Sequence, residues 1–75
     1  MDARVDVRGL TCSDAVVRLH RALTPLERGA LVEVTADDWA VLIDLKKYAE
    51  RGGHAWVSER KVTAGEYKVE VRRGA

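Results

Sequence analysis

Polar and apolar residues alternate with a period of two in several short stretches of the chain. This alternation is typical of strands with one buried face. It predicts four strands, over residues 4–8, 30–35, 54–62 and 66–72. The second of them is also rich in β-branched residues, which favour strands. Thr63, Ala64 and Gly65 lie between the last two strands and supply the turn of a hairpin.

Apolar residues return every three or four positions in two longer segments, which is the spacing of a helix with one buried face. In the first segment they are Val16, Leu19, Leu23 and Leu26. In the second they are Val41, Leu42, Leu45, Tyr48 and Ala49. Pro25 lacks a backbone donor and ends the first helix nearby. Asp37 or Asp38 caps the start of the second helix, and Gly52–Gly53 closes it.

The predicted order of elements along the chain is β-α-β-α-β-β. Two helices cannot cover both faces of four strands, so both are expected on one face, with the other face open to solvent. The predicted fold class is therefore α/β, a two-layer sandwich with a four-stranded mixed sheet. A length of 75 residues predicts a single domain over residues 1–75.

Composition narrows the possible partners. The 13 basic and 12 acidic side chains leave a formal net charge of +1, so neither a nucleic acid nor an anionic membrane is expected as a partner. Basic residues on the open sheet face are interleaved with acidic ones, which cancels most of their field. No stretch approaches the ~20 apolar residues that span a bilayer. A single cysteine cannot form an internal disulfide, which favours the reducing cytoplasm as the compartment.

The single cysteine, Cys12, lies at the predicted start of the first helix. Thr11 and Asp14 have the spacing of a capping box, which would make Cys12 the first helical residue. Unpaired N–H groups and the helix dipole are expected to lower the pKa of the thiol and favour the reactive thiolate, although the Asp14 carboxylate opposes this. Arg8 is the basic residue nearest in sequence and could assist. The alternative is a small apolar residue packed under the helix.

Trp56 is a further candidate binding residue. Ala55 and Val57 have the parity that suits burial, so Trp56 is expected on the opposite, open face of the sheet. There the indole either anchors an interface or folds over the stems of Lys68 or Arg72.

The remaining aromatic and imidazole side chains are expected to be structural. Trp39, at the start of the second helix, is expected to pack against the preceding loop, or else to flank the Cys12 end of the molecule. His20 is expected to be solvated, and His54 to fix the turn into the third strand. One cysteine and two scattered histidines do not make a zinc site, so no metal or other cofactor is expected.

Several short motifs occur in order along the chain. They are Asp6-x-Arg8-Gly9-Leu10-x-Cys12, Gly29, Asp37-Asp38, Asp44-Leu45 and Gly53-His54. In these motifs and in the order of its elements, the chain resembles the TusA family of small, SirA-like sulfur carriers over nearly its whole length. It departs from the family's Cys-Pro-x-Pro motif, which is Cys12-Ser13-Asp14-Ala15 here, so the first helical turn loses the stiffness that proline gives it. Asp38-Trp39 likewise stands where the family usually has Asp-Pro.

The resemblance implies that Cys12 carries sulfur as a persulfide. The candidate binding residues around it are Arg8, Thr11, Ser13 and Asp14, together with Trp56. The implied partners are a cysteine desulfurase or rhodanese-type donor and a downstream acceptor protein. Such exchange needs only an accessible thiolate, so the chain is expected to be a sulfurtransferase-type carrier rather than a stand-alone enzyme. A monomer is expected, because the carrier must dock with two partners in turn. The missing prolines favour one alternative, a divergent interaction module that keeps the fold without transferring sulfur.

Overall fold

The computed structural model describes residues 2–75. The elements in chain order are β1 (Ala3–Asp6), α1 (Cys12–Leu23), β2 (Leu31–Ala36), α2 (Trp39–Arg51), β3 (Ala55–Thr63) and β4 (Glu66–Arg72). The predicted order is therefore confirmed, and β4 has the predicted bounds. β1 ends two residues earlier than predicted, at Asp6, and β2 and β3 are each displaced by one residue toward the C-terminus.

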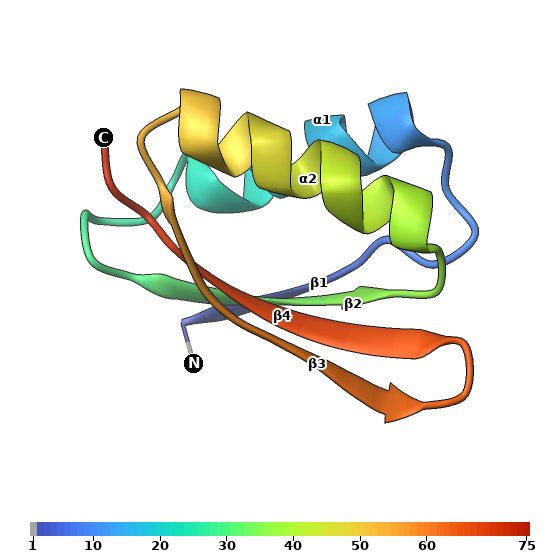
Figure 1. The fold of residues 1–75 in the computed structure, drawn as a ribbon. Coiled ribbons are helices and arrows are strands. Elements are labelled where there is room, and N and C mark those ends of the chain that lie inside the picture. The colour runs from blue at the N-terminus through green and yellow to red at the C-terminus, as the bar shows by residue number, and fades with distance from the viewer. Residues whose placement is uncertain (1) are drawn as a thin grey trace.

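The strands form one mixed sheet in the order β1-β2-β4-β3. β1 runs parallel to β2, whereas β4 runs antiparallel to both of its neighbours, β2 and β3. Both helices lie on the same face of the sheet (Figure 1), as the balance of two helices against four strands predicted. None of the helices within residues 2–75 is long and apolar enough to cross a bilayer.

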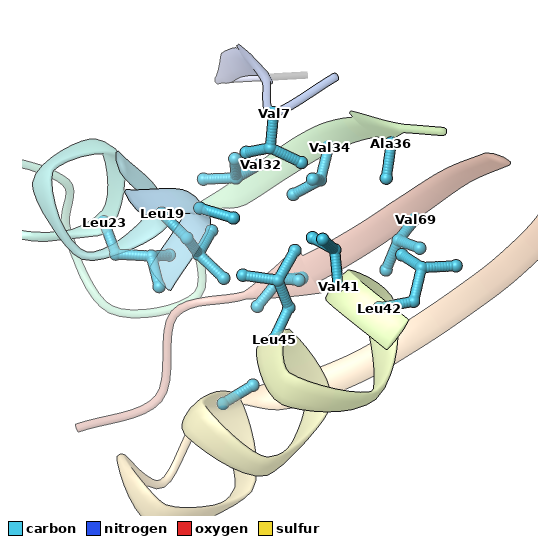
Figure 2. Packing of buried hydrophobic residues seen from close by; sticks show 13 residues of the cluster. Val7, Leu19, Leu23, Val32, Val34, Ala36, Val41, Leu42, Leu45 and Val69 are labelled. Carbon is cyan, nitrogen blue, oxygen red and sulfur yellow. The ribbon is translucent and has the colours of Figure 1, made fainter. Parts of the chain in front are cut away.

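The hydrophobic core lies between the helices and the covered face of the sheet. Figure 2 shows side chains from β2 and β4 pointing toward those of α1 and α2. The largest fully buried side chains are Leu19, Leu23, Leu42, Leu45, Val7, Val32, Val34, Val69 and Val71. The alternation of buried and half-buried residues along β2 matches the predicted period of two. Packing on this face fixes the position of α1, and with it the position of Cys12.

Side chains and backbone geometry cap both helices at their predicted ends. Thr11 accepts a hydrogen bond from the Asp14 backbone N–H at 3.2 Å, which starts α1 at Cys12 as predicted. Asp38, rather than Asp37, caps α2 by accepting from the Ala40 backbone N–H at 2.9 Å. The Asp37 carboxylate, which does not cap the helix, accepts a hydrogen bond from the Gly9 N–H at 3.2 Å. The β1–α1 loop is thereby tied to the β2–α2 loop.

A left-handed glycine ends α2. Gly53 has a φ of +77°, a conformation that a side chain would strain. Its N–H donates to the Glu50 carbonyl at 3.2 Å, and the following His54 N–H donates to the Ala49 carbonyl at 2.8 Å. This pair of bonds is a Schellman motif, and it confirms that Gly52–Gly53 closes the helix.

The predicted orientation of β3 is wrong. Ala55 and Val57 are exposed, whereas Trp56 is half-buried and packs against the core, where it pairs with Val71 of β4. The register shifts between Trp56 and Ser58, which marks a β-bulge at Val57. The indole has far more apolar surface to bury than Ala55, so the larger side chain takes the covered face.

Arg73, just after β4, ties the end of the chain to the end of α1. Its Nη1 atom donates to the carbonyls of Leu23, Thr24 and Leu26 at 2.8, 2.6 and 2.5 Å. These carbonyls lie at and beyond the C-terminus of α1, where no further turn of helix supplies N–H donors. The Arg73 guanidinium therefore acts as the C-terminal cap of α1 from a distant part of the chain.

Candidate functional site

Cys12 is the first residue of α1 and is a half-buried free thiol. It opens into a groove of about 590 Å³ between the start of α1 and one side of α2. The residues that line this groove, called the Cys12 groove below, are Cys12, Ser13, Val16, Asp44, Lys47, Tyr48, Arg51 and Gly52. The thiol therefore has access to solvent through this groove, while the rest of the Cys12 side chain packs against the core, as the alternative interpretation expected.

One face of α2 supplies most of the polar side chains of the Cys12 groove. Counted from the first of them, these side chains lie three, four and seven positions further along the helix, so they share one of its faces. They are Asp44, Lys47, Tyr48 and Arg51. The Asp44 carboxylate and the Tyr48 ring are half-buried, whereas Lys47 and Arg51 are exposed. The Cys12 groove thus brings together the thiol and, from the other helix, a carboxylate, a phenol and two cationic side chains.

The surroundings of Cys12 raise the pKa of its thiol, contrary to the prediction. The largest cause is hydrogen bonding to the Asp44 carboxylate, followed by partial burial and by the negative charges of Asp44 and Asp38. Backbone hydrogen bonding at Cys12 acts in the opposite direction but does not outweigh them. The start of the helix is where the sequence predicted it, and the carboxylates of α2 reverse its expected effect.

Three of the predicted binding residues flank Cys12, but only Ser13 lines its groove. Thr11 is engaged as the N-cap of α1. Asp14 points to a different hollow on the outer side of α1, which it shares with Leu10, Val17, Arg18 and Arg21. The acidic neighbour of the thiol is therefore Asp44, and Asp14 is not among the groups that shift the pKa of Cys12.

Arg8 does not line the Cys12 groove. Its guanidinium pairs with the Asp6 carboxylate at 2.8 Å and with the Glu66 carboxylate at 3.2 Å. Hydrogen bonding from Arg8 lowers the pKa of Asp6 to about 2. Arg8 therefore joins the β1–α1 loop to the start of β4, and it is not among the groups that act on the thiol.

Trp56 does not lie on the open face of the sheet, where it was expected, and Trp39 is the more exposed of the two tryptophans. The indole N–H of Trp56 donates to the Glu59 carboxylate at 3.0 Å, so its polar atom is satisfied on the covered side of the sheet. Trp39 is 51% exposed and stacks at a tilt on Tyr67, with 5.7 Å between ring centroids. Of the two, Trp39 is the indole available at the surface.

Tyr48 joins the Cys12 groove to two histidines, His20 of α1 and His54 after α2. The Tyr48 hydroxyl is 2.8 Å from Nδ1 of His20, and its ring lies 6.0 Å from that of His54. His54 Nδ1 accepts from the Gly74 backbone N–H at 3.0 Å, which is consistent with the structural role predicted for it. Burial, then the charges of Arg73 and His20, lowers the pKa of His54.

The sequence interpretation missed Asp44, Lys47 and Arg51 as neighbours of Cys12. Their helical spacing is visible in the sequence, but nothing local shows that this face of α2 points at the start of α1. Within residues 2–75, no three metal-ligating side chains come together.

Comparisons with known proteins agree with this fold. The sequence model of the family described as "Sulfurtransferase TusA" matches residues 3–73. The "Sulfur carrier protein TusA" of Pseudomonas paraeruginosa is 35% identical over 75 residues, which cover 100% of this chain and 94% of that protein. The protein of the same name from Pseudomonas entomophila is 31% identical over 74 residues, covering 99% and 91% of the two chains.

A solved structure is also similar to this one. The crystal structure of a SirA-like protein from Desulfitobacterium hafniense superposes with a TM-score of 0.85 at 28% sequence identity, covering 97% of this chain and 99% of that one. Fold, motifs and relatives together define a small α/β protein with a single thiol at a helix start. The chain belongs to the TusA family.

Proposed function

We propose that the protein is a sulfur carrier that holds sulfane sulfur on Cys12 as a persulfide. A cysteine desulfurase or rhodanese-type protein would supply the sulfur, and an acceptor protein would take it. The observation that carries the proposal is the half-buried free thiol at the start of α1, open to the Cys12 groove. The family match and the relatives named as sulfur carrier proteins support it.

The transfer is an exchange between sulfur atoms. In loading, the Cys12 thiolate attacks the outer sulfur of a donor persulfide, a new S–S bond forms, and the donor cysteine leaves as a thiolate. No oxidant is consumed, because one thiol and one persulfide become one persulfide and one thiol. A reducing cytoplasm suits this chemistry, since it keeps the resting thiol free. A monomer also suits it, because the same thiol must meet two partners in turn.

Ser13 lines the Cys12 groove and is the predicted neighbour that a docked partner would touch together with Cys12. Thr11, Asp14 and Arg8 would contribute indirectly. Thr11 fixes the helix start, Asp14 lies at the adjoining hollow, and Arg8 holds the preceding loop.

Mass spectrometry tests the proposal directly. Incubation with a cysteine desulfurase and free cysteine should add the mass of one sulfur atom to Cys12, and dithiothreitol should remove it. The Cys12→Ser variant should stay unmodified, whereas Ser13→Ala, the matched neighbour, should still be loaded. A wild-type protein that takes sulfur neither from a desulfurase nor from a rhodanese with thiosulfate would refute the carrier function.

A second candidate function is a protein-interaction module that no longer transfers sulfur. Two observations favour it, namely the run Cys12-Ser13-Asp14-Ala15 without prolines and the raised pKa of the Cys12 thiol. In this case Cys12→Ser should leave partner binding unchanged. Because Trp56 packs on the core and Trp39 is exposed, Trp39→Ala is now the substitution expected to weaken binding.

A further inference from the structure

The carboxylate of Asp44 is set beside the sulfur that the proposed carrier would load. It comes from α2, is half-buried, and lines the same groove as Cys12. None of the ion pairs formed within residues 2–75 includes Asp44. A half-buried carboxylate without a cationic partner exerts a stronger field on its neighbour than a paired one.

The other charged groups near the sulfur do not offset Asp44. Asp38, at the start of α2, also acts on Cys12 and has the same sign. Lys47 and Arg51 line the groove one and two turns further along α2 than Asp44. Neither is among the groups that shift the pKa of the Cys12 thiol. Tyr48, the remaining titratable group of the groove, has its hydroxyl against His20. The sulfur therefore lies at the negative end of the groove.

We propose that Asp44 is a retention residue, whose carboxylate makes the Cys12 sulfur a slow leaving group and so holds transferred sulfur on the carrier. The inference rests on the proposed function and deepens it. In release, an acceptor thiolate attacks the outer sulfur of the Cys12 persulfide. A bond forms between the acceptor sulfur and the outer sulfur, the bond from that sulfur to Cys12 breaks, and its electron pair leaves on Cys12.

The departing Cys12 thiolate then takes a proton to become the resting thiol. Its negative charge develops beside the Asp44 carboxylate, so Asp44 opposes this step by like-charge repulsion. A leaving thiol with a higher pKa leaves more slowly. The same carboxylate favours the S–H form of the empty carrier, because a thiol can donate a hydrogen bond to it and a thiolate cannot. Asp44 thus makes empty Cys12 less reactive and loaded Cys12 slower to discharge.

Two measurements on Asp44→Asn test the inference. The first is the pH dependence of Cys12 alkylation by iodoacetamide, which requires only the thiolate. Its midpoint should move to lower pH, and alkylation at pH 7 should become at least about threefold faster, since each pKa unit changes the thiolate fraction up to tenfold. Asp14→Asn, on the same end of α1 but outside the groove, is the matched control and should leave the midpoint unchanged.

The second measurement is the rate at which dithiothreitol strips sulfur from Cys12 after loading with sodium polysulfide. Asp44→Asn should discharge faster than wild type. The increase should be about threefold per unit of lowered pKa, if release depends on the leaving thiol as steeply as attack depends on the nucleophile. Asp44→Ser should behave in the same way, and thermal unfolding of all variants should match wild type, which excludes a merely structural effect.

The outcomes separate the two proposals. An unchanged alkylation midpoint in Asp44→Asn, or a shifted midpoint with unchanged discharge, would overturn the retention role and leave the carrier function standing. Failure of wild-type Cys12 to accept sulfur from either polysulfide or a desulfurase would refute the carrier function and the retention role together, whatever the alkylation midpoint.

Discussion

The guanidinium of Arg73 offers the sharpest stability prediction, because one side chain serves three carbonyls at the end of α1. Replacing it by methionine keeps most of the aliphatic stem and removes the three hydrogen bonds to Leu23, Thr24 and Leu26. Two of these bonds are half-buried and one is exposed. The substitution also removes the bond from Nε to the Ala75 carbonyl at 3.3 Å, which is exposed and not part of the cap. The backbone bonds between Arg73 and its neighbours Gly29 and Ala30 remain in the variant.

The magnitude follows from these bonds. A hydrogen bond from a charged donor contributes about 1.5–3 kcal/mol, but the three share one nitrogen and the exposed one is replaced by water. We therefore expect Arg73→Met to lower the free energy of unfolding by about 2–3 kcal/mol. A domain of this size has a total of only about 3–5 kcal/mol from its core. The melting temperature should fall by about 10 °C or more.

Urea unfolding followed by tryptophan fluorescence measures this change. Arg72→Met is the matched control, since the neighbouring Arg72 is exposed and donates one bond, to the Gly29 carbonyl at 3.1 Å. That variant should stay within about 0.5 kcal/mol of wild type. If Arg73→Met were no less stable than Arg72→Met, the reasoning that a distant guanidinium caps α1 would be wrong.

Two further predictions concern pH and the tryptophans. Since the pKa of His54 is lowered in the folded state, the unfolded chain binds the proton first, so stability should decline as pH falls below about 6.5. His54→Asn should flatten this decline in urea unfolding between pH 5 and 7, and an unchanged slope would contradict the assignment. Trp56→Ala should cost about 2 kcal/mol because the ring packs on the core, and Trp39→Ala less than about 1 kcal/mol. Denaturation midpoints in the reverse order would contradict the orientation of β3.

Local patterns in the sequence were sufficient to predict the six elements and their order. Each of the signals used depends on residues close together in the sequence. These signals are the period-two and period-3.6 spacings, the N-cap at Thr11 and the helix end at Gly53. The facing of β3 could not be predicted in this way, because a bulge at Val57 interrupts the alternation. Competition between Trp56 and its smaller neighbours for the covered face depends on the neighbouring strand β4.

The candidate site could be predicted only in part for the same physical reason. The position of Cys12 at the start of α1 depends on adjacent residues, and the sequence indicates it directly. The sign of its pKa shift depends on Asp44 of α2 and on Asp38, the residue that caps α2. How α1 and α2 meet is decided by core packing on the sheet, so no spacing within either helix indicates that Asp44 faces the thiol.

The position of the C-terminus has a practical consequence. In Figure 1 the chain ends beside the C-terminal ends of the two helices, whereas α1 begins at the far end of the helical layer. A tether, label or second protein joined after Ala75 would therefore lead away from Cys12. Ala75 lies against Gly53, next to the Gly52 end of the Cys12 groove, so a bulky fusion should crowd that end of the groove while Cys12 stays at the other.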